Sequence, residues 1–299
     1  MALPASGTLA MSTIASSVGT VAPNSMNELT RLTAVGSNAS TFKTSNFYSW
    51  PDGGYKNGSP GILFDFGLNA NYSNSGSTVS DRSGNGRNGT FVTGTGNGTA
   101  ATIDQYTGTF PGQMNIPGDT PQKSVRLDDY AKFSGTDNYT VIAWVKITSF
   151  TSSYPGVVAA EGRSGGNPIG WGLYMTNASG YQVAHQRFDG TSGSGTNIAL
   201  TFGSGGVPSI AFNTWYMVAA RFDGSTMALS LHTAGSRYDA STGNSYSLST
   251  DASWSAFLGL RYNNWQNGPV GYMAIYGSDL GTGVLDTIYA STRIRYGNA

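Results

Sequence analysis

Hydrophobic side chains alternate with a period of two residues along most of the chain beyond residue 60. The segment NYTVIAWVKITSF (138–150) shows this most clearly: residues 139, 141, 143, 145 and 147 share one face, and residues 140, 142, 144, 146 and 148 share the other. A β-strand places successive side chains on opposite faces, whereas a helix would repeat every 3.6 residues. This alternation predicts a strand and restricts the chain to a β-rich fold.

Glycine-rich and polar segments separate further strands of this kind. The segment TWYMVAARFDGSTMALSLHTAG (214–235) predicts a hairpin that turns at Asp223–Gly224. Only TGVLDTIYAST (282–292) has a helical period beyond residue 60, and we interpret GSGTNIALTFGSGG (193–206) as a flexible loop. Other strands are expected at 61–67, 89–93, 125–133, 157–161, 170–176, 181–188, 256–262 and 268–280. About a dozen short strands predict an all-β sandwich or jelly roll.

Composition excludes several classes of protein. The formal net charge is zero and charged residues make up 11% of the chain, which argues against nucleic-acid binding, since that needs a basic surface. There is no cysteine, so disulfides and thiolate metal sites are excluded. No apolar run approaches the roughly 20 residues that span a bilayer. The first basic residue is Arg31, so we expect neither a cleaved signal peptide nor a membrane contact.

Four segments resemble the laminin-G-like, concanavalin A-like family in its usual order. They are ILFDFGLN with VSDRSGNGRNGTFV, YAKFSGTDNYTVIAWVKI, WYMVAARFDGSTMALSLHTAG and GPVGYMAIYGSDL. The resemblance implies a two-sheet jelly-roll sandwich over residues 61–299. Two departures argue against a ligand or calcium site inherited from the family. Thr233-Ala234-Gly235 stands where Asp-Gly is usual, and Gly271-Tyr272-Met273 stands where an acidic pair is usual.

The first 35 residues predict an N-terminal arm with two short helices, followed by an extended linker over 36–60. The peptide ALPASGTLAMSTIASSVGT is similar to the N-terminal peptide of bacteriophage virion proteins, which implies a tail, fibre or capsid-surface component. Helices this short gain stability only against a partner, so we interpret the arm as a docking segment. Its expected docking residues are Leu3, Pro4, Leu9, Ile14, Val18, Met26 and Leu29.

The loop DRSGNGRNG (81–89) has two interpretations. Asp81, Ser83 and Asn85 supply alternating oxygens, and a structural Ca²⁺ would bind such oxygens. Ca²⁺ usually takes 6–8 oxygen ligands, however, and a loop of turn-forming residues around one carboxylate is typical of a sharp reversal. We favour the turn, and no cofactor is required.

Catalytic residues are scarce. Glycoside hydrolysis normally needs two carboxyl groups that flank the bond, and the chain has two glutamates, Glu28 and Glu161. The adjacent Asp128 and Asp129 would point to opposite faces of a strand, so a solvated turn is the better interpretation. The single histidines in two predicted strands, His185 and His232, are expected to be structural. We therefore predict that the protein is not an enzyme.

Carbohydrate binding is the more promising chemistry. Aromatic faces cover the apolar C–H surface of sugar rings, and amide side chains form hydrogen bonds with hydroxyl groups. The alternative is that these aromatic rings pack over the ends of the sheets. The candidate residues are Trp171, Tyr181, Tyr262, Asn263, Asn264, Trp265 and Gln266.

The sequence thus predicts a bacteriophage virion structural protein at the particle surface or tail, assembled in the host cytoplasm and without a signal peptide. It would dock to other virion proteins through its arm, display a lectin-like sandwich toward host surface polysaccharide, and form a homo-oligomer, because virion appendages follow particle symmetry. Two alternatives remain open: a polysaccharide depolymerase or glycosidase on the same fold, and a secreted bacterial lectin-like adhesin.

Overall fold

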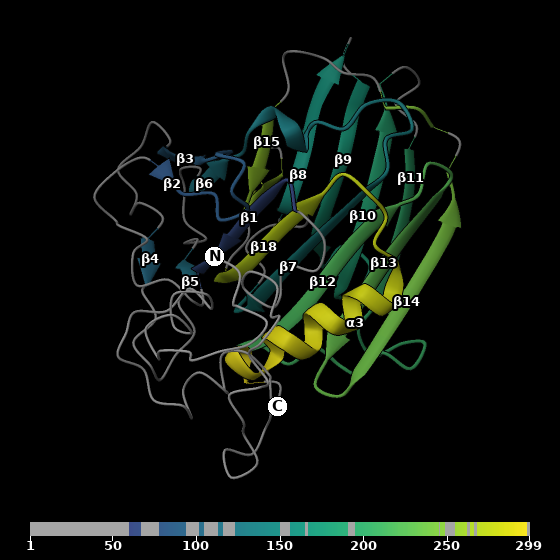
Figure 1. Cartoon of the computed structure of the whole chain (residues 1–299). Helices are drawn as coiled ribbons and strands as arrows, with labels where there is room; N and C mark the ends of the chain where they lie inside the picture. The colour runs from purple at the N-terminus through teal and green to yellow at the C-terminus, as the bar shows by residue number, and fades with distance from the viewer. Residues whose placement is uncertain are drawn as a thin grey trace, which may run out of the picture.

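Two mainly antiparallel β-sheets lie face to face in the computed structural model of the chain (Figure 1). The structure describes residues 60–66, 78–93, 102–104, 113–115, 123–149, 156–164, 167–190, 195–244, 246–248, 255–261, 264–265 and 268–297. The predicted arm (1–35), the linker (36–60) up to residue 59, and all seven docking residues lie outside these ranges.

Sheet A is built around the central strand β7. Its strand order is β14 (Ser236–Gly243), β13 (Thr226–Thr233), β12 (Thr214–Phe222), β7 (Tyr139–Ile147), β18 (Val270–Tyr276), β5 (Gln113–Asn115) and β4 (Thr102–Asp104). A further strand, β1 (Ile62–Asp65), also pairs with β18. The hairpin β12–β13 turns where predicted: Asp223 Oδ1 accepts hydrogen bonds from the amides of Ser225 and Thr226, and Gly224 has φ +95°.

Sheet B contains the remaining strands. Its order is β11 (Gly195–Thr201), β10 (Gln182–Asp189), β9 (Asn167–Thr176), β8 (Gly156–Ser164), β15 (Ser255–Leu258), β6 (Lys123–Arg126), β3 (Gly89–Thr93) and β2 (Thr78–Val79). Two short strands, β16 (Leu260–Arg261) and β17 (Asn264–Trp265), adjoin it, and β17 pairs with β8.

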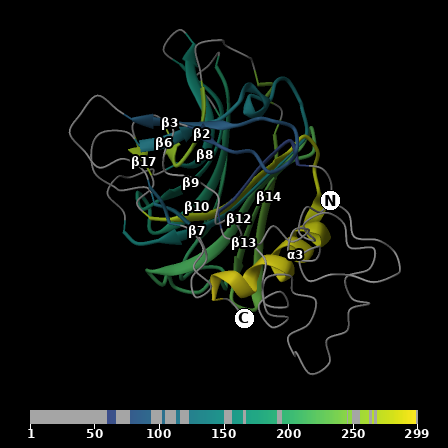
Figure 2. The ribbon, with the colours of Figure 1, turned by 60° about the vertical axis from the view of Figure 1, so that its left-hand side comes forward.

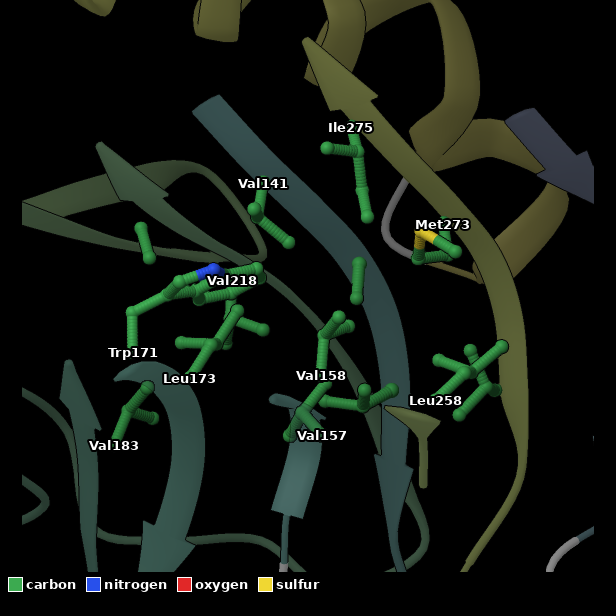
Figure 3. Packing of buried hydrophobic residues seen from close by; sticks show 14 of the residues in the cluster. Val141, Val157, Val158, Trp171, Leu173, Val183, Val218, Leu258, Met273 and Ile275 are labelled. Carbon is green, nitrogen blue, oxygen red and sulfur yellow. The ribbon is translucent and has the colours of Figure 1, made fainter. Parts of the chain in front are cut away.

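The space between the sheets is filled by side chains from their inner faces. In Figure 3, Trp171, Leu173 and Val183 of sheet B point toward Val141 and Val218 of sheet A. Burial of each large aliphatic side chain contributes about 1.5–3 kcal/mol, so this layer supplies most of the stability of the sandwich. The predicted all-β, concanavalin A-like sandwich is confirmed.

The outer face of sheet A is apolar as well, and α3 (Gly281–Thr292) covers it (Figures 1 and 2). Trp144 stacks on Tyr289 and on Tyr296, with ring centroids 5.6 and 4.6 Å apart. Tyr296 belongs to the 3-10 turn η5 (Arg293–Tyr296) that follows the helix. The indole N–H of Trp144 donates to the Thr292 hydroxyl at 2.7 Å. The helical period at 282–292 was therefore predicted correctly.

Two predictions of local structure were wrong. The segment 193–206 is not a flexible loop, because residues 195–201 form β11, and Ile198 and Leu200 pack into the core. The segment 125–133 is not one strand. Asp128 ends it by accepting a hydrogen bond from the amide of Tyr130, which opens the 3-10 turn η4 (Asp129–Ala131).

Among the described residues, no helix is long and apolar enough to cross a membrane.

We expect Thr292→Val to lower the free energy of unfolding by about 1–3 kcal/mol, because it leaves the buried indole N–H of Trp144 without an acceptor. Urea titration measures the change. Thr287→Val is the matched control on the same helix, since the exposed Thr287 hydroxyl donates only to the Gly283 carbonyl of the same helix among the described residues. Thr292→Ser should restore stability, and equal effects of the two valine substitutions would refute the assignment.

Candidate functional site

The outer face of sheet B carries small residues at its centre. Ala159 of β8 lies opposite Gly172 of β9, and Gly172 lies opposite Gln186 of β10. Glu161 extends over the glycine: a Cβ at residue 172 would meet its Oε1 at 2.6 Å. The glycine leaves room for this carboxylate, which a larger residue would displace, so the centre of the face has small side chains and one acidic group.

Polar contacts mark one end of this face. The Tyr174 hydroxyl donates to Asn197 Oδ1 at 3.0 Å, and the Gln182 amide donates to the Thr201 hydroxyl at 2.9 Å. The backbone register runs from Trp265 in β17 to Gly156 in β8 and on to Tyr174 in β9. The backbone of Trp265 is thus in register with Tyr174, which carries one of these polar groups.

An exposed aromatic pair lies at the same end of the strands. Tyr181 precedes β10 and Phe212 precedes β12, and their rings meet edge to face with centroids 5.5 Å apart at 89°. They are 39% and 40% exposed, and no other large hydrophobic residue among those described is classed as exposed. Asn213 has φ +62°, the one positive φ at a described non-glycine residue, and its amide donates to the Ile147 carbonyl at 2.6 Å. This left-handed turn sets the course of the chain beside Phe212.

Six of the seven predicted sugar-binding residues fall into three groups. Tyr181 is exposed to solvent. The backbones of Asn264 and Trp265 form β17, while Tyr262, Asn263 and Gln266 lie outside the described residues. The sequence did not identify Phe212, although an aromatic residue in a polar turn between two strands is a usable signal.

Trp171 is the correction among these candidates. Odd-numbered residues of β9 face the core, and Trp171 is completely buried. Its indole N–H donates to the Ala131 carbonyl at 2.9 Å, and its ring packs against Phe133 and Tyr139. A sugar in solvent cannot reach this ring, so the alternative of aromatic packing holds at this position.

The loop 81–88 is organised by hydrogen bonds to Asp81. Its Oδ1 accepts from the amides of Leu63 and Ser83, and its Oδ2 accepts from the Ser83 hydroxyl and the Arg87 amide. The Asn85 side-chain amide donates to the carbonyls of Pro60 and Gly61. In this arrangement the three calcium candidates tie the loop to β1, and no group of three metal-ligating side chains occurs among the described residues.

The adjacent aspartates form no carboxylate pair. Asp128 caps the 3-10 turn, and Asp129 forms an ion pair with Lys132 at 2.9 Å. Both are exposed, as a solvated turn predicts.

A family model described as the concanavalin A-like lectin/glucanases superfamily matches residues 119–281, which is more than half of the chain. The chain belongs to this superfamily. Strands β7–β13 and β18 all lie within the matched segment. The match ends at residue 281, where α3 begins.

Solved structures share the concanavalin A-like fold at low sequence identity. The binding domain of botulinum neurotoxin serotype G has a TM-score of 0.53 and 13% identity, over 77% of this chain and 50% of that one. The serotype D ligand-binding domain in complex with N-acetylneuraminic acid has a TM-score of 0.53 and 16% identity, over 78% and 51%. This chain therefore spans about half the length of the toxin domains.

The match to a third structure covers almost the whole of that structure's chain. Domain 4 of AbnA, a GH43 extracellular arabinanase from Geobacillus stearothermophilus in complex with arabinotriose, has a TM-score of 0.51 and 19% identity, over 77% of this chain and 98% of that one. The search of curated proteins found no match.

Both histidines of this concanavalin A-like domain are buried. Burial, and then the charge of Arg187, lowers the pKa of His185 to about 3. Burial likewise lowers the pKa of His232 to about 4, although Asp286 opposes the change. His232 stacks on Tyr289 beneath α3, with centroids 4.8 Å apart. Both side chains have structural surroundings, in line with the expectation from the sequence.

Acid should destabilise the protein through these histidines. The unfolded chain binds a proton at each histidine as the pH falls through about 6.5, whereas the folded protein does not until about 3 or 4, so stability is lost below pH 6.5. Between pH 7.5 and 5.0 each histidine should lower the free energy of unfolding by about 2 kcal/mol. Urea titrations of the wild type and His185→Gln test this. The variant should lose about half of the pH dependence, and an unchanged slope would contradict the prediction.

Proposed function

We propose that this concanavalin A-like domain binds carbohydrate, without cleaving it, at the Tyr181–Phe212 pair and the adjoining end of sheet B. The observation that carries the proposal is the meeting of the two exposed aromatic rings. Two rings at 89° offer two perpendicular apolar surfaces, and sugar rings present apolar C–H faces that stack on such surfaces.

Neighbouring groups supply the complementary polar chemistry. Gln182 and Thr201 lie where β10 and β11 meet beside Tyr181, and Tyr174 and Asn197 lie farther along the same face. Amide and hydroxyl groups both donate and accept, so they suit the hydroxyl groups of a sugar. The arabinotriose and N-acetylneuraminic acid in the titles of the two similar structures support a saccharide as the class of ligand.

The distribution of carboxylates supports binding rather than hydrolysis. Glycosidases place two carboxyl groups about 5–9.5 Å apart on either side of the bond. Among the described strands of sheet B, Glu161 is the one carboxylate on the outer face, and it is nearly buried over Gly172. A lone carboxylate cannot act as both acid and nucleophile or base.

The setting that we propose is a bacteriophage virion. The resemblance of residues 2–20 to virion N-terminal peptides supports an arm that docks to other virion proteins, with the sandwich displayed toward host surface polysaccharide. A homo-oligomer would fit the symmetry of such a particle and would give weak sugar sites the benefit of multivalency.

Tyr181→Ala and Phe212→Ala should each weaken glycan binding about tenfold, because each removes one stacking surface. A glycan array of bacterial surface polysaccharides identifies the ligand, and calorimetry measures the affinities. Tyr181→Phe keeps the ring and should bind as the wild type does. Asp129→Ala, an exposed change on η4, is the unrelated control. Full affinity in both alanine variants would reject the site, and shortened glycan products would reject the absence of hydrolysis.

Deletion of residues 1–35 should leave a soluble, folded sandwich that no longer enters phage particles, because the deletion removes the arm and no described strand. Mass spectrometry of purified particles measures incorporation, and circular dichroism confirms the β structure. Normal incorporation of the truncated protein would reject the docking role and leave the glycan site untouched.

A further inference from the structure

Arg187 is a charged side chain in the interior of the sandwich. It lies on the inner face of β10, next to Trp171 in the register, and it is completely buried. Its guanidinium carbon lies 3.5 Å from the centre of the Phe222 ring and 5.5 Å from that of Tyr139. Arginine stays protonated in proteins, so a full positive charge is enclosed between the two sheets.

The hydrogen bonds of this guanidinium are incomplete. Nη2 donates to the Gly135 carbonyl at 3.2 Å and to the Tyr246 carbonyl at 3.5 Å, both at or beyond the long end of the usual range. Nε and Nη1 are buried and have no hydrogen-bond partner among the residues that the structure describes. None of the ion pairs found between described residues includes Arg187. Two of its three nitrogens therefore lack an acceptor among the described residues.

The neighbouring titratable groups do not supply the opposite charge. His185 Nδ1 lies 3.2 Å from the Ala228 carbonyl, which can only accept, so Nδ1 carries the proton. His185 Nε2 is then the acceptor for the Tyr139 hydroxyl at 2.8 Å. Burial raises the pKa of Tyr139 to about 12 and lowers that of His185 to about 3. Both groups are neutral at physiological pH.

The aromatic rings compensate for this charge only in part. A ring face attracts a cation, but the attraction is smaller than the cost of removing an unpaired charge from water. A water molecule would satisfy the free N–H groups and leave the charge itself uncompensated. A small anion would satisfy both.

We propose that Arg187 holds a small monovalent anion, chloride in its simplest form, at Nε and Nη1 in the interior of the sandwich. Gly135 and Leu248 form an isolated β-bridge, and the Gly135 carbonyl accepts from Nη2, so this bridge borders the guanidinium. The anion binds the folded protein and not the unfolded chain, so it stabilises the fold by mass action.

The test compares thermal unfolding in sodium chloride, sodium bromide and sodium gluconate at one constant ionic strength. Above the dissociation constant, each tenfold rise in chloride should raise the Tm of the full chain by about 3–5 °C relative to gluconate. Arg187→Met should abolish the difference between chloride and gluconate. A bromide-soaked crystal should show an anomalous peak at hydrogen-bond distance from Nε and Nη1.

Arg221→Met is the matched control, because Arg221 is also largely buried but pairs with Asp279 at 2.8 Å. This variant should keep the halide response of the wild type. An equal halide response in wild type and Arg187→Met would overturn the proposal, and so would a water molecule without anomalous signal at the two nitrogens. The crystal decides the matter even if Arg187→Met does not fold.

Discussion

Strand β7 is buried on both faces, and this constraint determines the order of the layers. Its inner side chains pack against sheet B, so the second sheet is required. Its outer side chains, with Trp144 at their centre, are too apolar to face water, so α3 must return across sheet A after the last strand. The layers are thus sheet B, sheet A and helix. Sheet B retains an outer face on which polar and small residues replace the apolar ones.

The strands that could be predicted from the sequence are those whose alternation involves large apolar residues. In β7 and β12 the alternation continues for nine residues, and in β18 it covers residues 272–276 beyond a bulge. Edge strands lack this pattern of alternating large apolar residues. Most residues of β14 are polar or half-exposed, because only one face of an edge strand at the end of the sandwich meets the core. In β11 the two core residues, Ile198 and Leu200, are hidden between glycine-rich segments.

The candidate site was predictable in part, for a related reason. Tyr181 stands in a polar turn, where an aromatic side chain has no core to enter. Trp171 alternates with Leu173 and Met175, and that period already places it on the core face, but the flanking glycines conceal the pattern. The contact between Tyr181 and Phe212 joins loops from different sheets. Pairing of this kind depends on how the sheets stack, and a local pattern does not contain that information.

The aromatic pair and the buried guanidinium lie at opposite ends of the same two strands. Tyr181 and Phe212 precede β10 and β12, whereas Arg187 and Phe222 stand at the far ends of those strands. At about 3.3 Å per residue, six residues separate Tyr181 from Arg187 by roughly 20 Å. Sites farther apart than about 10 Å without shared partners act additively. Anion binding should therefore set the stability of the sandwich without altering affinity at the aromatic pair, which makes the two proposals independent in experiment as well as in argument.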